Sequence, residues 1–399
     1  MKILGLSKTS VGAPWAVRQA RDLVKLGVEI HIALPPDGPR VQQFRDVGAI
    51  VHPLAPDLPV RAPWRYPRVR QELRDVVAQV QPDIIHSYHV GTTLTMRLAL
   101  GRLCPTPRVF QVPGPLHLEH AFYRRAEIAT AGPSDYWIGT CHWIAERYRR
   151  SGVAPERLFV SDYGVDLDEH TDRERGYLRR ELGLDASAIL VGMVGLMYAP
   201  KHYLGQTRGL KGHEDLIDAL ALCLRENPDL RGVFIGGAWN NAGAYESHVR
   251  AYARRLCGDY AIFLGTRADV PRLLPDLDIA VQPSHTEGVA ATAVEAQLLG
   301  IPVIATNVGG QPDLIVDGET GWLVPPRAPA RLAAAIMDAV RNPEHTRMMA
   351  LAGQERARRL FNGVENNRQV LDIYHTILSR RQRRDDPLSS YCVEQSIAR

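Results

Sequence analysis

Short apolar runs alternate with longer stretches of helical periodicity along the first third of the chain. Residues 2–7 (KILGLS) have the continuous apolar character of a buried strand, and residues 28–34 (VEIHIAL) repeat it. Between them, residues 13–27 have the spacing of an amphipathic helix that ends at Gly27. The strand pattern returns at 49–54, 82–89, 107–112, 134–140 and 156–161. This alternation predicts a parallel sheet with helices on both faces.

A polar stretch at 171–187 separates this series from a second one and is predicted to be a linker that runs into a connecting helix. Helices are expected at 213–227 and 291–300. The strands of the second series are expected at 188–196, 232–237, 260–265, 277–284 and 301–306. We therefore predict an α/β protein with two doubly wound domains, which bind ligands at the carboxyl ends of their strands.

The bulk composition agrees with two soluble domains. A chain of 399 residues is too long for one ordinary core, and 45% hydrophobic with 23% charged residues is typical of globular proteins. Residues 1–160 contain 21 Lys/Arg against 13 Asp/Glu, whereas the remainder contains 27 against 31. This asymmetry suggests an anionic partner for the first half, although we favour the simpler interpretation of a solvated arginine-rich surface.

Cysteine usage favours a reducing compartment, and the hydropathy pattern gives no sign of a membrane span. The cysteines are five in number, an odd count, and no two form a CxxC pair. The chain begins with a strand pattern rather than a signal peptide, and no apolar run approaches the ~20 residues of a membrane span. We expect a cytoplasmic protein with at most peripheral contact at the inner membrane face.

Two glutamates eight positions apart, Glu287 and Glu295, flank a stretch of small residues. A helix is expected from about 289 to 299, so its free backbone N–H groups lie just after Gly288 without bulky side chains around them. Such a helix start attracts a phosphate or diphosphate. Glu295 would lie roughly 9 Å along this helix, so each carboxylate could accept hydrogen bonds from hydroxyls at one end of the diphosphate.

This stretch resembles the glutamate–seven residues–glutamate motif of the retaining glycosyltransferases of family four (glycosyl transferases group 1), which have the GT-B fold. Residues 268–288 and 300–326 resemble the rest of the family's donor-site block, and residues 163–170 resemble its turn at the domain junction. Weaker similarity is found at 82–89 and 209–222. The resemblance extends from residue 2 to about 378.

The resemblance implies roles for individual residues. Glu287 would contact hydroxyls of the donor sugar, and Glu295 would hold the ribose of the nucleotide. The amides that would hold the distal phosphates belong to Gly288, Val289, Ala290 and Ala291, and the backbone that would meet the base belongs to Thr266 and Arg267.

The sequence departs from the family at two places. Where the family has an arginine after a strand-ending glycine, Leu196 follows Gly195, although the family's lysine is present as Lys211. We expect Arg208 to supply the missing charge on the diphosphate, with Lys201 as the second choice and neither as the remaining alternative.

The second departure lies after the strand at 107–112, where the family often has a histidine near the reacting sugar. Pro113 takes that position, and we expect His117 to replace the histidine, ahead of His120; a solvated loop histidine is the alternative. Gly12 stands where the family has a flexible glycine loop that meets acceptor or donor phosphate. A single glycine is weak evidence, and no GxGxxG fingerprint is present.

Other motifs carry less weight. The sequence spells DxD at 166–168 and 276–278, but the first falls in the domain-junction turn and the second opens a strand, so both are interpreted as structural. The histidines show no metal-ligand spacing, and no metal or other cofactor is expected. Four arginines between 61 and 70 lack any supporting nucleic-acid motif, so no nucleic-acid partner is expected.

The resemblance predicts a retaining, metal-independent transfer of a sugar from a nucleotide-diphosphate sugar, most simply a UDP-sugar, to a hydroxyl acceptor. The acceptor would be a small metabolite, a glycan or a lipid-linked glycan. We expect residues 1–165 with a returning helix in 364–380 to bind it, residues 166–363 to bind the donor, and 381–399 to form a polar tail. A sugar epimerase or phosphorylase of the same fold, or a degenerate nucleotide-binding regulator, remains as the alternative.

Overall fold

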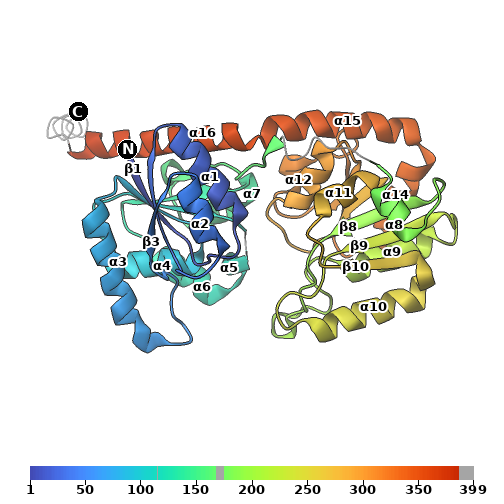
Figure 1. Cartoon of the computed structure of the whole chain (residues 1–399), viewed down its shortest axis with the longest axis horizontal. Coiled ribbons are helices and arrows are strands. Elements are labelled where there is room, and N and C mark those ends of the chain that lie inside the picture. Colours follow the sequence, from blue (N-terminus) through green and yellow to red (C-terminus); the bar gives the residue numbers. More distant parts are fainter. Residues whose placement is uncertain (115, 168–174, 386–399) are drawn as a thin grey trace, which may run out of the picture. The chain divides into compact units, whose positions relative to one another are not determined.

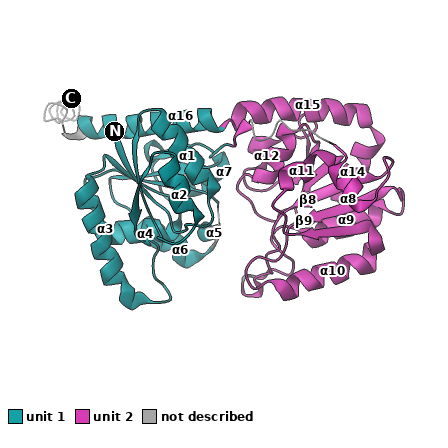
Figure 2. Cartoon of the chain, in the orientation of Figure 1, with its two compact units in different colours: residues 1–164, 363–399 teal, residues 165–362 magenta. Residues whose placement is uncertain are grey.

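The computed structural model describes residues 1–114, 116–167 and 175–385 (Figure 1). The chain divides into two compact units (Figure 2). Unit 1 comprises residues 1–164 and the chain from 363 onward, and unit 2 comprises residues 165–362. The greater part of the expected tail at 381–399 lies outside the described residues.

Unit 1 contains a parallel seven-stranded sheet in the order β3-β2-β1-β4-β5-β6-β7. Its strands are β1 (Lys2–Leu6), β2 (Glu29–Leu34), β3 (Ile50–Pro53), β4 (Ile84–Ser87), β5 (Arg108–Val112), β6 (Asp135–Gly139) and β7 (Leu158–Val160). The central strands are buried because helices cover both faces, and most of their residues are apolar. Buried polar residues also occur in them, among them His86 on β4 and Arg108 on β5.

Two apolar cores lie on the two faces of this sheet. The helices of unit 1 are α1 (Pro14–Lys25), α2 (Pro39–Asp46), α3 (Tyr66–Val80), α4 (Val90–Leu100), α5 (Leu116–Glu119), α6 (Ala121–Thr130), α7 (His142–Arg150) and α16 (Gly363–Asp385). The final helix, α16, packs against α1. There Asn367 Nδ2 donates a 2.8 Å hydrogen bond to buried Asp22, and the Tyr374 hydroxyl bonds to buried His86.

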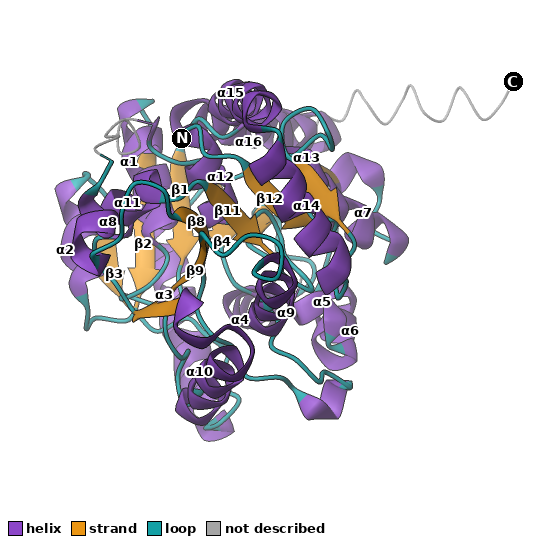
Figure 3. Ribbon diagram, turned by 90° about the vertical axis from the view of Figure 1, so that its right-hand side faces the viewer, coloured by secondary structure: helices purple, strands orange, loops and turns teal. Residues whose placement is uncertain are grey.

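Unit 2 contains a parallel six-stranded sheet in the order β10-β9-β8-β11-β12-β13. Its strands are β8 (Ile189–Val194), β9 (Leu230–Ile235), β10 (Ala261–Gly265), β11 (Ile279–Gln282), β12 (Val303–Thr306) and β13 (Trp322–Val324). Its helices are α8 (Tyr177–Leu182), α9 (His213–Cys223), α10 (Gly243–Cys257), α11 (Val270–Leu273), α12 (Ala291–Leu298), α13 (Gln311–Leu314), α14 (Pro329–Arg341) and α15 (Pro343–Leu360). Helices again cover the sheet (Figure 3), and a separate apolar core lies on each of its faces.

Both sheets reverse their strand order once, between β1 and β4 in unit 1 and between β8 and β11 in unit 2. Doubly wound sheets bind ligands at this point, beyond the carboxyl ends of the strands. The predicted fold class, two doubly wound α/β domains, is therefore confirmed. Within the described residues, no helix is both long and apolar enough to cross a bilayer.

Candidate active site

A cavity of about 340 Å³ lies in unit 2 at the carboxyl ends of the strands, where the strand order reverses. Its walls come from the loops after β8, β9 and β10 and from the segment that joins β11 to α12. The lining residues are Val194, Gly195, Leu196, Tyr198, Lys211, Ile235, Gly236, Thr266, Arg267, Val270, Glu287, Val289, Ala290, Ala291 and Thr292. The structure thus brings Lys211 together with Thr266, Arg267 and the segment around Glu287 in one cavity.

An ion pair between Lys211 and Glu287 lies in the cavity wall. The Ser284 hydroxyl donates a 3.2 Å hydrogen bond to the same carboxylate, and Gln282 Nε2 donates one of 2.8 Å to Ser284 Oγ. The side chains of Lys211 and Glu287 keep 20% and 16% of their surface exposed. A ligand therefore meets a cation and a carboxylate that are already held in place, the first suited to phosphate and the second to sugar hydroxyls.

Two glycines let the backbone approach closely enough to form this wall. Gly212 has φ +73°, and a Cβ there would lie 2.0 Å from the carbonyl oxygen of Pro283. Gly309 has φ +56°, and a Cβ there would lie 1.8 Å from the carbonyl oxygen of Glu287. Because only glycine fits such positions, the two residues fix how the Lys211 and Glu287 loops pack on their neighbours.

Helix α12 starts at the cavity with Ala290 as its N-cap, and no side chain caps it. Val289, Ala290 and Ala291 line the cavity as predicted, so the amides at this helix start are accessible to an anion. Gly288 does not line it; its carbonyl instead accepts a 2.9 Å hydrogen bond from the Gly310 N–H, which anchors the loop.

The other predicted donor residues differ in their positions. Thr266 and Arg267 line the cavity, and Arg267 is held by Glu181 at 2.6 Å and Asp269 at 2.7 Å. The hydrogen bonds from Arg267 lower the pKa of the Asp269 carboxyl to about 2. Glu295 lies half-buried on α12, four residues after Ala291, the first residue of the helix, and it does not line the cavity.

The expectation that Arg208 supplies the missing charge disagrees with its position. Its guanidinium pairs with Asp215 at 2.5 Å and Asp218 at 2.7 Å, and it does not line the cavity. These two carboxylates of α9 hold the guanidinium there, and their hydrogen bonds raise its pKa against the opposing effect of burial. Lys201, the second choice, is exposed and also outside the lining. Leu196 does line the cavity, so an apolar side chain faces it at the family's arginine position.

Arg208→Ala is therefore expected to lower the melting temperature of unit 2 while changing UDP affinity by less than about threefold. Its loss leaves Asp215 with His285, 2.6 Å away, as its remaining partner. Calorimetric titration and thermal unfolding measure the two effects, with Lys201→Ala as the control. A loss of UDP affinity at unchanged stability would restore Arg208 to the donor site.

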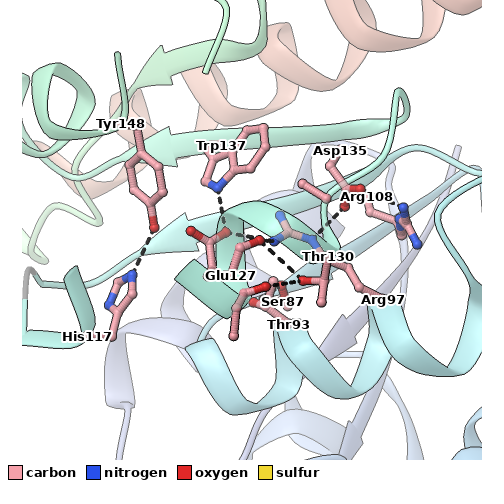
Figure 4. A network of polar contacts seen from close by, with 12 residues as sticks. Ser87, Thr93, Arg97, Arg108, His117, Glu127, Thr130, Asp135, Trp137 and Tyr148 are labelled. Carbon is pink, nitrogen blue, oxygen red and sulfur yellow. Dashed lines mark hydrogen bonds and ion pairs between the residues drawn. The ribbon is translucent and has the colours of Figure 1, made fainter. Parts of the chain in front are cut away.

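Unit 1 contains the three residues predicted for the site of the first domain, His117, His120 and Gly12. His117, on α5, bonds through Nε2 to the Tyr148 hydroxyl at 2.9 Å (Figure 4). Burial lowers the pKa of His117 to about 4, so its imidazole is neutral at pH 7. Gly12 is exposed after β1, and its carbonyl accepts a 3.2 Å hydrogen bond from Arg40 Nε. His120 is exposed at the start of α6.

The second DxD sequence has a structural role. The Asp276 carboxylate accepts hydrogen bonds from the backbone N–H groups of Gly176, Leu178 and Arg179 at the start of α8, and Asp278 pairs with Arg179 at 2.6 Å. Residue 168 of the first DxD lies outside the described residues. In the part of the chain that the structure describes, no three His, Cys, Asp or Glu side chains form a metal-binding group.

Sequence reasoning missed Tyr198, which lines the cavity from the loop after β8 and contacts the ring of Trp239 at a centroid distance of 5.8 Å. Its loop has no regular periodicity, so no pattern marked it. It also missed Thr292, whose hydroxyl donates a 3.0 Å hydrogen bond to Gln282 Oε1. Thr292 directly follows Ala291 in the predicted helix start, and this position could have identified it as a residue of the site.

Comparison with known proteins agrees with this geometry. The family model described as Glycosyltransferase Family 4 matches residues 15–169, and the one described as Glycosyl transferases group 1 matches residues 202–356. A D-inositol 3-phosphate glycosyltransferase from Segniliparus rotundus is 33% identical over 208 residues, covering 51% of this chain and 44% of the relative. Its counterpart from Corynebacterium kroppenstedtii is 31% identical, with 57% and 49% covered. The chain therefore spans less than half the length of these curated relatives.

Solved structures are similar over nearly the whole chain. The UDP complex of Anabaena HepE has a TM-score of 0.79 at 22% identity and covers 94% of this chain and all of its own. Sucrose-phosphate synthase from Thermosynechococcus elongatus has a TM-score of 0.76 at 19% identity, with 95% and 100% covered. At these identities the likeness establishes the fold, which is GT-B. Together with the family models, it shows that the chain belongs to the GT-B glycosyltransferases of the family 4 type.

Proposed function

We propose that the chain transfers a sugar from a nucleotide-diphosphate sugar to a hydroxyl acceptor, with retention of configuration and without a metal ion. The observation that carries this proposal is the Lys211–Glu287 ion pair beside the uncapped start of α12, in one cavity at the switch point of unit 2. A cation and helix amides suit a diphosphate, and an adjacent carboxylate suits sugar hydroxyls.

In this mechanism, negative charge builds on the leaving diphosphate as the anomeric bond breaks. Lys211 and the amides of Val289, Ala290 and Ala291 stabilise that charge, and fixed groups do so at low reorganisation cost. Glu287 orients the sugar through its hydroxyls, and the segment Thr266–Arg267 meets the base. The leaving phosphate takes the acceptor's proton on the face from which it departs, which gives retention. Unit 1 supplies the acceptor site.

We propose UDP as the nucleotide. Solved complexes of Anabaena HepE contain UDP and UDP-glucose, which supports this choice by analogy of fold. The acceptor class stays open among small metabolites, glycans and lipid-linked glycans. The curated relatives are named for a phosphorylated cyclitol, which places soluble phosphorylated polyols first in an acceptor screen.

The first test is calorimetric titration of the full chain with UDP, GDP and ADP. We expect UDP to bind, and Glu295→Ala to weaken its binding roughly tenfold or more, because the ribose hydroxyls would lose the carboxylate that is proposed to accept their hydrogen bonds. Glu319→Ala, which removes an exposed carboxylate elsewhere in unit 2, is the matched control. If no nucleotide binds, Leu196 and its loop have closed the site to diphosphates, and the proposed transfer from a nucleotide-diphosphate sugar is wrong.

A further inference from the structure

A second cavity, of about 590 Å³, lies in unit 1 between α6 and α7. Its described lining consists of Arg124, Arg125, Ile128, Ala129, Arg147, Arg150 and Ser151. Four of these residues are arginines, and none is acidic. Because like charges repel, an anionic occupant would stabilise a cluster of arginines such as this one.

The neighbourhood compensates this charge only in part. Glu146, which lies on α7, binds Arg149 at 2.6 Å and Arg150 at 2.8 Å, and these hydrogen bonds lower the pKa of its carboxyl to about 2. Arg147 lies over the ring of Trp143 at 5.2 Å. Among the described residues, neither Arg125 nor Arg147 pairs with a carboxylate. Both guanidiniums therefore keep their charge available for a ligand.

Buried contacts hold the two walls of this cavity (Figure 4). On α6, the Glu127 carboxylate bonds to buried Arg97 at 2.7 Å and to the Trp137 indole N–H at 2.8 Å. On α7, Tyr148 is buried and bonds to His117. The two helices that carry the arginines are thus held in place by their buried inner faces.

We propose that this cavity binds a phosphate-bearing ligand with at least two anionic groups, at a site separate from the donor cavity. Guanidinium groups present planar, paired donors that match phosphate oxygens, and they do so better than the ammonium of lysine. A volume of about 590 Å³ lies within the range of small-molecule sites and is larger than a single phosphate group would fill. The ligand is a soluble organic phosphate or the headgroup of an anionic lipid.

The test uses inorganic pyrophosphate as the probe and the full chain with saturating UDP, which occupies the donor cavity of unit 2. We expect one pyrophosphate to bind, and the double variant Arg125→Ala/Arg147→Ala to weaken it by roughly 100-fold, because two charged hydrogen-bond donors are lost. The double variant Arg61→Ala/Arg65→Ala removes the same charge from exposed positions of unit 1 and is expected to bind as the wild type does. The proposal is wrong if both double variants lose pyrophosphate affinity equally. It is also wrong if the wild type binds neither pyrophosphate nor vesicles.

A vesicle arm distinguishes the two sources of phosphate. If the ligand is a lipid headgroup, the wild type and the control variant co-sediment with phosphatidylglycerol vesicles, and Arg125→Ala/Arg147→Ala does not. None of the three proteins co-sediments with phosphatidylcholine vesicles. For a soluble ligand, pyrophosphate binds and neither vesicle does. The readout does not depend on the proposed activity, since a chain that fails to bind UDP would still show the difference between the two double variants.

Discussion

Lys211→Ala is expected to lower turnover of the nucleotide sugar by roughly 100- to 1000-fold, the effect of removing one fixed group that stabilises transition-state charge. Among the described residues that line the donor cavity, the cations are Lys211 and Arg267, and Arg267 is already shared between two carboxylates. Lys211 pairs with one carboxylate, that of Glu287, so in the proposed reaction it is the cation expected to meet the leaving diphosphate. The measurement is steady-state release of UDP from the donor, with kcat and KM determined separately.

Lys201→Ala is the matched control, because it removes a lysine from the same loop that is exposed and does not line the cavity. Its kcat is expected to stay within about twofold of the wild type. Thermal unfolding of both variants shows whether Lys211→Ala still folds, since the substitution leaves Glu287 without its cation. If folded Lys211→Ala keeps wild-type kcat, then Lys211 only positions Glu287, and the leaving-group role assigned to it is wrong.

The sequence predicted the sheets well for a physical reason. Strands buried on both faces are rich in apolar residues, so β1 and β8 appear as nearly unbroken apolar runs, whereas β4 starts with two isoleucines and ends in buried His86 and Ser87. Strand β13 was not predicted: Trp322–Val324 is three residues long and lies in the segment 300–326 that was recognised for its resemblance to the donor-site block. Helix α12 was predicted because glycines and a strand bound it on both sides, although it begins at Ala291 rather than near 289.

The sequence was most informative about those parts of the candidate site whose positions follow from the backbone, such as the start of α12. The small residues of the α12 start and the carboxylate of Glu287 lie on the cavity as the sequence suggested. Arg208 could not be placed in this way, because its position depends on Asp215 and Asp218, which follow it on α9 and attract the guanidinium. Long side chains in a loop respond to neighbouring charges that spacing alone does not reveal.

Unit 1 is expected to lose stability in mild acid well before unit 2. Burial lowers the pKa of His86 to about 3, that of His89 to about 3 and that of His117 to about 4, so all three are neutral in the folded unit. In unit 2, burial lowers the pKa of His213 to about 4. In the unfolded chain each histidine has a pKa near 6.5.

Below pH 6.5 the unfolded chain therefore binds protons that the folded unit does not, and stability falls as the pH falls. At pH 5 the three histidines of unit 1 cost on the order of 6 kcal/mol, comparable to the stability of a whole domain, whereas His213 costs about 2 kcal/mol. Asp57 has the opposite effect on the pH dependence of stability, because burial raises the pKa of its carboxyl. It is a single group, and the three buried histidines of unit 1 outweigh it. Hydrogen exchange read by mass spectrometry at pH 7 and pH 5 is expected to show protection lost from β1 and β4 before β8 and β11.

His89→Asn tests the cause of this acid sensitivity. Removing one buried neutral histidine is expected to reduce the loss of stability between pH 7 and pH 5 by about 2 kcal/mol, whatever it does to stability at pH 7. His345→Asn replaces an exposed histidine and is expected to leave the pH dependence unchanged. The measurement is urea unfolding of both variants at the two pH values. If His89→Asn and His345→Asn show the same pH dependence as the wild type, the buried histidines do not stay neutral, and acid destabilises unit 1 through its carboxylates instead.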